Sequence, residues 1–141
     1  MTGKIKRYRL LSWLLLPALL WPPSALAEES WVPEGCDKAV ATGDMRDCLD
    51  AGLKKANDQL RTLNRQLDRA LSKPERDKLH KAQMSWRGYV YDTCRSESFL
   101  YNGGTMEIVI YRWCELELTV QNIERMREAY KQRLHAAGVS E

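Results

Sequence analysis

The stretch 42-TGDMRDCLDAGLKKANDQLRTLNRQLDRAL-71 decides the fold of this chain. Its apolar residues recur at alternating steps of four and three positions: Leu49, Leu53, Ala56, Leu60, Leu63, Leu67 and Ala70. That spacing lines one face of an α-helix, and charged residues fill the other faces. Thr42 can accept a hydrogen bond at the helix start, where the Asp44 carboxylate also suits the positive end of the helix. The pattern predicts a helix over about 42–71.

The next four residues, Ser72-Lys73-Pro74-Glu75, end the first helix and begin a second. Ser72 and Glu75 have the spacing of a capping box, and proline is tolerated in a first helical turn because its missing N–H has no partner there. We expect the second helix to span about 73–99. Its predicted inward positions are Leu79, Ala82, Trp86, Tyr89 or Val90, and Thr93.

A turn follows at Asn102-Gly103-Gly104, since both glycines adopt positive φ freely. The tract Ile108-Val109-Ile110 alone would suit a strand, but its continuation into a helical period favours a helix. We therefore predict a third helix over about 105–136, with a stripe at helical spacing: Val109, Trp113, Leu116, Val120, Ile123, Tyr130 and Leu134.

Together the three patterns predict an all-α fold, an antiparallel three-helix bundle over about 42–71, 73–99 and 105–136. The short connections make consecutive helices antiparallel neighbours. Residues 28–41 form a short N-terminal segment laid against the bundle. The 114 residues of 28–141 suffice for one hydrophobic core, and hence for one domain.

The chain contains four cysteines, at positions 36, 48, 94 and 114. Cys94 and Cys114 are equally distant from the Gly103-Gly104 turn, so they face each other across a helical hairpin. Cys36 and Cys48 flank the start of the first helix, and a bond between them would tie the N-terminal segment to it. Four cysteines allow three pairings, and the sequence leaves the other two open. A zinc site is disfavoured because the cysteines lack C-x-x-C spacing.

The first 27 residues have the three parts of a cleaved secretory signal. Four basic residues precede an apolar run from Leu10 to Trp21, and Ala25-Leu26-Ala27 supplies small residues for cleavage. The run is shorter than the roughly 20 residues that a membrane-crossing helix needs, so we expect no membrane anchor after cleavage. Export predicts a periplasmic or secreted protein with oxidised cysteines. Cleavage would leave 18 basic and 19 acidic residues over 28–141, against 22 and 19 in the full chain.

We predict no catalytic site, no metal site and no cofactor. His80 lies between lysines on a helix flank and His135 lies near the C-terminus, so neither suits nucleophilic catalysis. The Gly103-Gly104 turn lacks the Lys-Ser/Thr of a phosphate-binding loop. No basic patch with stacking aromatics remains after residue 27, so the sequence argues against nucleic acid as a partner.

Aromatic side chains and one arginine gather around the turn between the second and third helices: Tyr89, Tyr91, Arg95, Phe99, Leu100, Tyr101 and Asn102. Tyrosine and arginine offer contact area and hydrogen bonds at limited entropic cost, which suits protein recognition. We predict that a protein partner binds at Tyr91, Arg95, Tyr101 and Asn102. The alternative is that Tyr89, Phe99 and Leu100 close the end of the core.

Several motifs occur in a fixed order along the chain. They are Cys36, Thr42-x-x-Met45-x-x-Cys48, Asp58-x-x-x-x-Leu63-Asn64, Gln83-x-x-Trp86, Cys94, Gly103-Gly104-Thr105, Cys114 and Thr119. In this order and spacing the chain resembles the lysozyme inhibitor LprI-like N-terminal domain family. The resemblance implies a small helical secreted or periplasmic protein and, more loosely, inhibition of lysozyme. It marks Gln83, Trp86, Gly103, Gly104 and Thr119 as motif residues.

Two positions depart from that family pattern. The family often has Arg-Asp between the tryptophan and the next cysteine, where this chain has Val90-Tyr91-Asp92. It often has an arginine three residues after the threonine, where this chain has Asn122. A polar network that uses those arginines would therefore differ here.

The expected function is that of a non-enzymatic binding protein that masks a lysozyme or another peptidoglycan hydrolase. Such an enzyme works through two carboxylates in a cleft, which Arg95 or the Tyr101 hydroxyl would meet. Lysozymes are commonly basic, and a net charge of −1 over 28–141 offers little electrostatic steering towards them. The alternative is an envelope-stress or immunity protein with a different dedicated protein partner. A hydrolase that uses the chain's own carboxylates is the third hypothesis.

Overall fold

The computed structural model describes residues 31–139, so the predicted signal peptide over 1–27 lies outside the described residues. The elements are two short 3-10 helices and three long α-helices: η1 (Cys36–Lys38), α1 (Thr42–Ala70), α2 (Lys73–Ser98), η2 (Phe99–Tyr101) and α3 (Met106–Ala136). Residues 31–139 contain no strand. The predicted all-α bundle is confirmed, and each predicted helix boundary agrees with the structure to within one residue.

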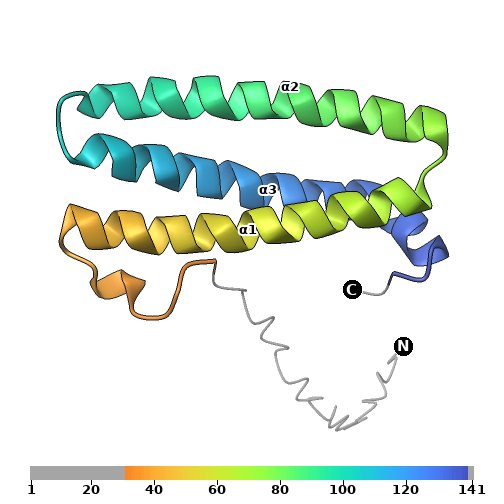
Figure 1. Cartoon of the computed structure of the whole chain (residues 1–141), viewed down its shortest axis with the longest axis horizontal. Helices are drawn as coiled ribbons and strands as arrows, with labels where there is room; N and C mark the ends of the chain where they lie inside the picture. Colours follow the sequence, from red (N-terminus) through yellow and green to blue (C-terminus); the bar gives the residue numbers. More distant parts are fainter. Residues whose placement is uncertain (1–30, 140–141) are drawn as a thin grey trace, which may run out of the picture.

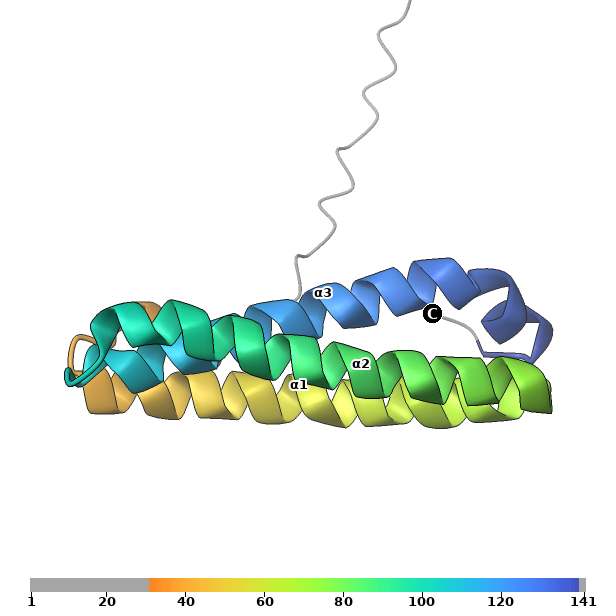
Figure 2. The ribbon, with the colours of Figure 1, turned by 90° about the horizontal axis from the view of Figure 1, so that it is seen from above.

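The three helices run antiparallel in an up-down-up order, with α3 lying between α1 and α2 over much of its length (Figure 1). α3 packs extensively against both other helices, whereas α1 and α2 share no extensive interface of their own. Towards its C-terminal end α3 rises away from the other two helices (Figure 2). Because, among the described helices, α2 packs extensively against α3 alone, whereas α3 packs against both α1 and α2, α2 buries a narrow face and α3 buries a broad one.

The main hydrophobic core runs along the α1–α3 interface and reaches the start of α2. Its buried members are Leu49, Ala56, Leu60, Leu63, Leu67, Leu71, Leu79, Val109, Leu116, Ile123, Met126 and Leu134. A second, smaller cluster closes the opposite end of α2 and consists of Val90 with Cys94 and Cys114. The predicted α1 stripe is therefore in the core, with Leu53 and Ala70 only partly buried at its margin.

One predicted inward position on α2 is wrong, because Ala82 is exposed; of the alternatives Tyr89 and Val90, Tyr89 is exposed. Val90, the alternative to Tyr89, is buried. The physical reason is that, within residues 31–139, α3 is the one helix that packs extensively against α2. The buried face of α2 is therefore too narrow to include both flanks of the predicted stripe.

On α3 the prediction of a buried Trp113 is also wrong, since 57% of this residue is exposed. The buried face of α3 covers contacts with both α1 and α2, and its side towards α2 includes two polar residues, Thr119 and Asn122. A stripe drawn through apolar residues alone omits them. It therefore places the centre of the buried face too far towards Trp113.

Charged side chains hold the connection between α1 and α2. The predicted capping box is confirmed: the Glu75 carboxylate accepts hydrogen bonds from the Ser72 N–H at 2.8 Å and from the Ser72 hydroxyl at 2.7 Å. It also pairs with Arg133 of α3 at 2.6 Å. The hydrogen bonds from Ser72, and then Arg133, lower the pKa of the Glu75 carboxyl. Arg76 donates to the Leu71 carbonyl oxygen at 2.6 Å, which satisfies a group at the end of α1.

The N-terminal segment is tied to α1 by the Cys36–Cys48 disulfide, with the two Cα atoms 5.8 Å apart. Lys55 places its ammonium group 5.5 Å from the centre of the Trp31 ring. Gly52 lies directly beneath this segment. A Cβ atom added there would approach the Trp31 carbonyl oxygen to 2.6 Å and the Leu116 side chain to 3.1 Å.

Gly52 and Gly88 form a matched pair for testing this packing. Both lie inside helices, but a Cβ atom at Gly88 would meet nothing within 4 Å. We expect Gly88→Ala to raise the free energy of unfolding by about 0.5–1 kcal/mol, because alanine orders more readily in a helix. Gly52→Ala should lower it, since overpacking costs about 1–3 kcal/mol and exceeds the same helical gain. Urea denaturation of both variants measures the difference, and equal shifts would contradict a close contact with the N-terminal segment.

Candidate functional site

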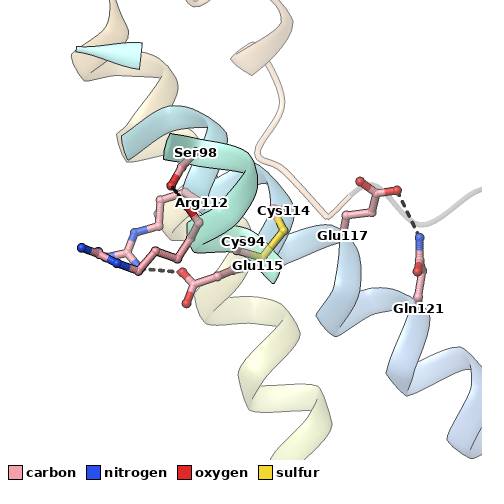
Figure 3. Close-up of a disulfide and its surroundings, with 8 residues drawn as sticks. Cys94, Ser98, Arg112, Cys114, Glu115, Glu117 and Gln121 are labelled. Carbon is pink, nitrogen blue, oxygen red and sulfur yellow. Dashed lines mark hydrogen bonds and ion pairs between the residues drawn. A yellow bond between two sulfur atoms is a disulfide. The ribbon is translucent and has the colours of Figure 1, made fainter. Parts of the chain in front are cut away.

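The end of the α2–α3 hairpin is braced by the Cys94–Cys114 disulfide, whose residues are almost fully buried. Figure 3 shows this bond joining the two helices, with the Arg112–Glu115 ion pair on one side and Glu117 and Gln121 on the other. The chain then reverses through η2 and a turn in which Gly103 has a φ of 82°. Cys94 lies about one helical turn before the end of α2, and Cys114 about two turns after the start of α3, so the bond restricts the position of the residues between them.

Beyond the brace, large side chains face solvent. We call Phe99, Leu100, Tyr101 and Asn102 the hairpin tip. The exposed fractions of its three apolar residues are 64% for Phe99, 83% for Leu100 and 47% for Tyr101. The alternative in which Phe99, Leu100 and Tyr89 close the core is therefore wrong. Contiguous exposed apolar residues on a small protein are typical of an interaction surface.

The four predicted partner-binding residues are all exposed, and they belong to three different surface features. Tyr101 and Asn102 belong to the hairpin tip. Arg95 lines a shallow hollow of about 330 Å³ between the end of α2 and the start of α3. Tyr91 lies one helical turn before Arg95 and lines a different feature, the groove described next. Tyr111 lines both the hollow and the groove, so it connects the two surfaces.

An open groove of about 620 Å³ lies between α1 and α2, with α3 as its floor. We call it the interhelical groove. It exists because α1 and α2 share no extensive interface. Its walls and floor carry aromatic, amide and charged side chains: Asn57, Arg61, Asn64, His80, Gln83, Trp86, Arg87, Tyr91, Tyr111, Glu115 and Thr119.

Buried polar side chains form the floor of the interhelical groove. Gln83 and Thr119 line it, and Asn122 lies beside them; all three are buried. The Asn122 amide donates to the Gln83 side-chain oxygen at 3.4 Å, and the Gln83 amide donates to the Met126 sulfur at 3.1 Å. Arg125 donates to the Asn122 oxygen at 3.0 Å. Sequence reasoning treated Gln83 and Thr119 as structural residues and did not identify the groove.

A charged cluster at one end of the groove ties α1 to α3. The Arg112 guanidinium lies 2.9 Å from Asp50 on α1 and 2.6 Å from Glu115 on its own helix. Burial, followed by the charge of Glu115, raises the pKa of the Tyr111 hydroxyl. Tyr111 therefore remains a neutral hydrogen-bond donor and acceptor at the edge of the groove.

The histidines lie where the sequence suggested. His80 is exposed and pairs with Asp68 at 2.8 Å, and His135 is exposed near the end of α3. Among residues 31–139 no group of three His, Cys, Asp or Glu side chains is arranged to hold a metal ion. Within the same described part, no helix has the length and hydropathy needed to span a bilayer.

These features define a class: a small all-α protein, braced by two disulfides, with an exposed apolar hairpin tip. The sequence profile of the family described as Lysozyme inhibitor LprI matches residues 36–126. The chain therefore belongs to the LprI family, whose proteins are typically extracytoplasmic. It is also similar to an uncharacterized protein of Rhizobium meliloti (strain 1021), with 27% identity over 106 residues, covering 66% of this chain and 76% of the relative. No solved structure gave a significant match.

The structure shows where the two positions that depart from the family pattern lie. Asn122, where an arginine was expected, is buried and bonds to Gln83. Tyr91, in the segment where Arg-Asp was expected, is exposed on the wall of the interhelical groove. Both departures therefore change the chemistry of the groove and leave the hairpin tip unaffected.

Proposed function

We propose that this protein is an exported, non-enzymatic inhibitor of a lysozyme or a related peptidoglycan hydrolase, and that the hairpin tip enters the partner's cleft. The observation that carries the proposal is the exposure of Phe99, Leu100 and Tyr101 beyond a buried disulfide, in a chain of the LprI family. A rigid, solvent-exposed apolar projection loses little conformational entropy on binding.

Arg95 supplies the polar part of this proposal. It lies next to Cys94, is exposed, and has no ion pair or hydrogen bond from its guanidinium to any residue of 31–139. Glycoside hydrolases of this class work through a pair of carboxylates, and guanidinium–carboxylate pairs form two parallel hydrogen bonds. An unpaired arginine beside the tip suits such a cleft. Since the net charge over 28–141 is −1, contacts at the tip rather than long-range attraction would supply most of the affinity.

The test is a cell-wall lysis assay with the oxidised protein and several lysozymes. We expect inhibition by the wild type, and a loss of about tenfold or more in Tyr101→Ala and in Arg95→Ala, the size of effect that hot-spot residues show. Tyr89→Ala is the matched control, because Tyr89 is similarly exposed (56% against 47% for Tyr101) but lies outside both the hairpin tip and the interhelical groove. Absence of inhibition at stoichiometric excess against every lysozyme would refute the proposal. Equal losses in Tyr89→Ala and Tyr101→Ala would refute the role of the tip.

A further inference from the structure

The floor of the interhelical groove has hydrogen-bonding capacity that the described chain does not use. Thr119 is 3% exposed, and its hydroxyl has no hydrogen bond to any residue of 31–139. Gln83 donates to a thioether sulfur, a weak acceptor, and accepts one long bond of 3.4 Å from Asn122. Buried polar groups in folded proteins are normally satisfied. The floor is open to solvent, and its hydrogen-bonding groups are only partly satisfied. It is therefore suited to a ligand that carries both hydrogen-bond donors and acceptors.

The walls of the groove add flat aromatic surface. Trp86 is partly buried between the two core clusters, and Tyr91 and Tyr111 lie further along the same groove. An aromatic face carries partial negative charge, so it attracts the C–H groups on one face of a saturated ring. The groove volume of about 620 Å³ lies in the range of small-molecule sites.

One cation in the groove remains available. Arg61 pairs with Asp58, and Glu115 pairs with Arg112. Arg87 is exposed on the α2 wall and has no ion pair or hydrogen bond from its guanidinium within 31–139. It lies one helical turn before Tyr91, so a carboxylate bound by Arg87 would belong to a ligand that contacts the aromatic wall.

We propose that the interhelical groove binds an N-acetylated amino sugar that carries a carboxylate. Its hydroxyl and acetamide groups would bond to Thr119 and Gln83, its ring would lie against Trp86 or Tyr91, and its carboxylate would pair with Arg87. An extended peptide that binds by strand addition fits less well, because that mode pairs backbone with backbone, and the backbone groups of helix interiors are already bonded within the helices. The inference concerns a surface other than the hairpin tip and does not depend on lysozyme inhibition.

The experiment is a titration of the isotopically labelled, oxidised protein with N-acetylmuramic acid, followed by amide and indole chemical shifts. We expect saturable shifts along the groove, including those of Trp86. N-acetylglucosamine, which lacks the carboxylate, should bind about tenfold more weakly, because a charge-assisted hydrogen bond is lost.

Two variants separate the contributions of the floor and the wall. Arg87→Gln should abolish the preference for N-acetylmuramic acid over N-acetylglucosamine, and we expect it to leave the fold intact because Arg87 is exposed. Thr119→Val, nearly isosteric, should weaken both sugars by about fivefold through loss of one hydrogen bond. Arg95→Gln is the matched control, an exposed arginine on the same helix outside the groove, and should leave sugar binding unchanged.

Several results would overturn the proposal. They are the absence of saturable shifts up to the solubility limit of the sugar, equal affinity for the two sugars, or shifts confined to the hairpin tip. Tighter binding of an acidic peptide than of N-acetylmuramic acid would assign the groove to a protein segment instead. Arg95 belongs to the proposed inhibitory surface and Arg87 does not. A negative sugar titration would therefore not affect the proposed inhibition of lysozyme, which the lysis assay tests separately.

Discussion

Replacing Ile123 with alanine is expected to lower the free energy of unfolding by about 2–5 kcal/mol. Ile123 is 0% exposed at the middle of α3 and belongs to the main core. Removing its side-chain atoms loses their transfer free energy and leaves a cavity, because both flanking helices are held at their ends and cannot close it fully. A domain of this size has about 5–15 kcal/mol of stability in total, so the loss would be a large part of it.

Ile108→Ala is the matched control for this prediction. It is the same chemical change on the same helix, but Ile108 is 41% exposed. We expect it to change the free energy of unfolding by no more than about 0.5 kcal/mol, since alanine also favours the helix. Urea denaturation gives both values, and an unchanged denaturant slope would show that the comparison is between similar folded and unfolded states. Similar losses in the two variants would contradict the placement of Ile123 in the core.

The fold was predictable from sequence because each helix is specified by several independent signals. The alternating spacing from Leu49 to Ala70, the Ser72–Glu75 capping box and the Gly103-Gly104 turn all agree, and all three appear in the structure. The Gly103-Gly104 turn favoured the Cys94–Cys114 pair that the structure contains, because residues equally far from a helical hairpin turn lie opposite each other, although the sequence left the other pairings open.

The detailed burial was less predictable, and the reason is the unequal packing of the three helices. A stripe of apolar residues gives the direction of a single buried face. α3 has two neighbours, and polar Thr119 and Asn122 lie on the face turned towards α2. Polar residues at helical spacing from apolar ones are therefore the signal that would have indicated the interhelical groove. Gln83, one turn after Leu79, is the corresponding signal on α2.

The two proposed surfaces meet at α2. Tyr91 faces the groove, while Arg95, one helical turn later, faces the hollow beside the hairpin tip. Sequence reasoning placed both in one partner-binding set because they are close along the chain. Residues four apart lie on the same side of a helix, so the structure separates these two along the axis of α2, with Arg95 one turn nearer the hairpin tip. This separation is what allows variants at Arg87 and Arg95 to test the two surfaces independently.

Removing the Cys94–Cys114 disulfide by the double change Cys94→Ala and Cys114→Ala should lower the free energy of unfolding by about 3 kcal/mol. The bond closes a loop with a sequence separation of 20, and the loss of such a constraint allows the unfolded chain more conformations. Both residues are also buried in the small cluster with Val90, so their truncation adds a packing loss.

The double change Cys36→Ala and Cys48→Ala is the matched control. Its sequence separation is 12, so its loop contribution is slightly smaller, and it releases only the N-terminal segment from α1. Thermal and urea unfolding should therefore show the larger loss for the 94–114 pair.

The lysis assay gives a second readout. If the hairpin tip is the inhibitory surface, loss of the 94–114 brace should weaken inhibition under conditions where the bundle is still folded, because the tip must then be ordered on binding. Loss of the 36–48 bond should leave inhibition unchanged. Equal effects of the two pairs on inhibition would contradict a role for the braced tip, and equal stability of the 94–114 variant and the wild type would contradict the constraint itself.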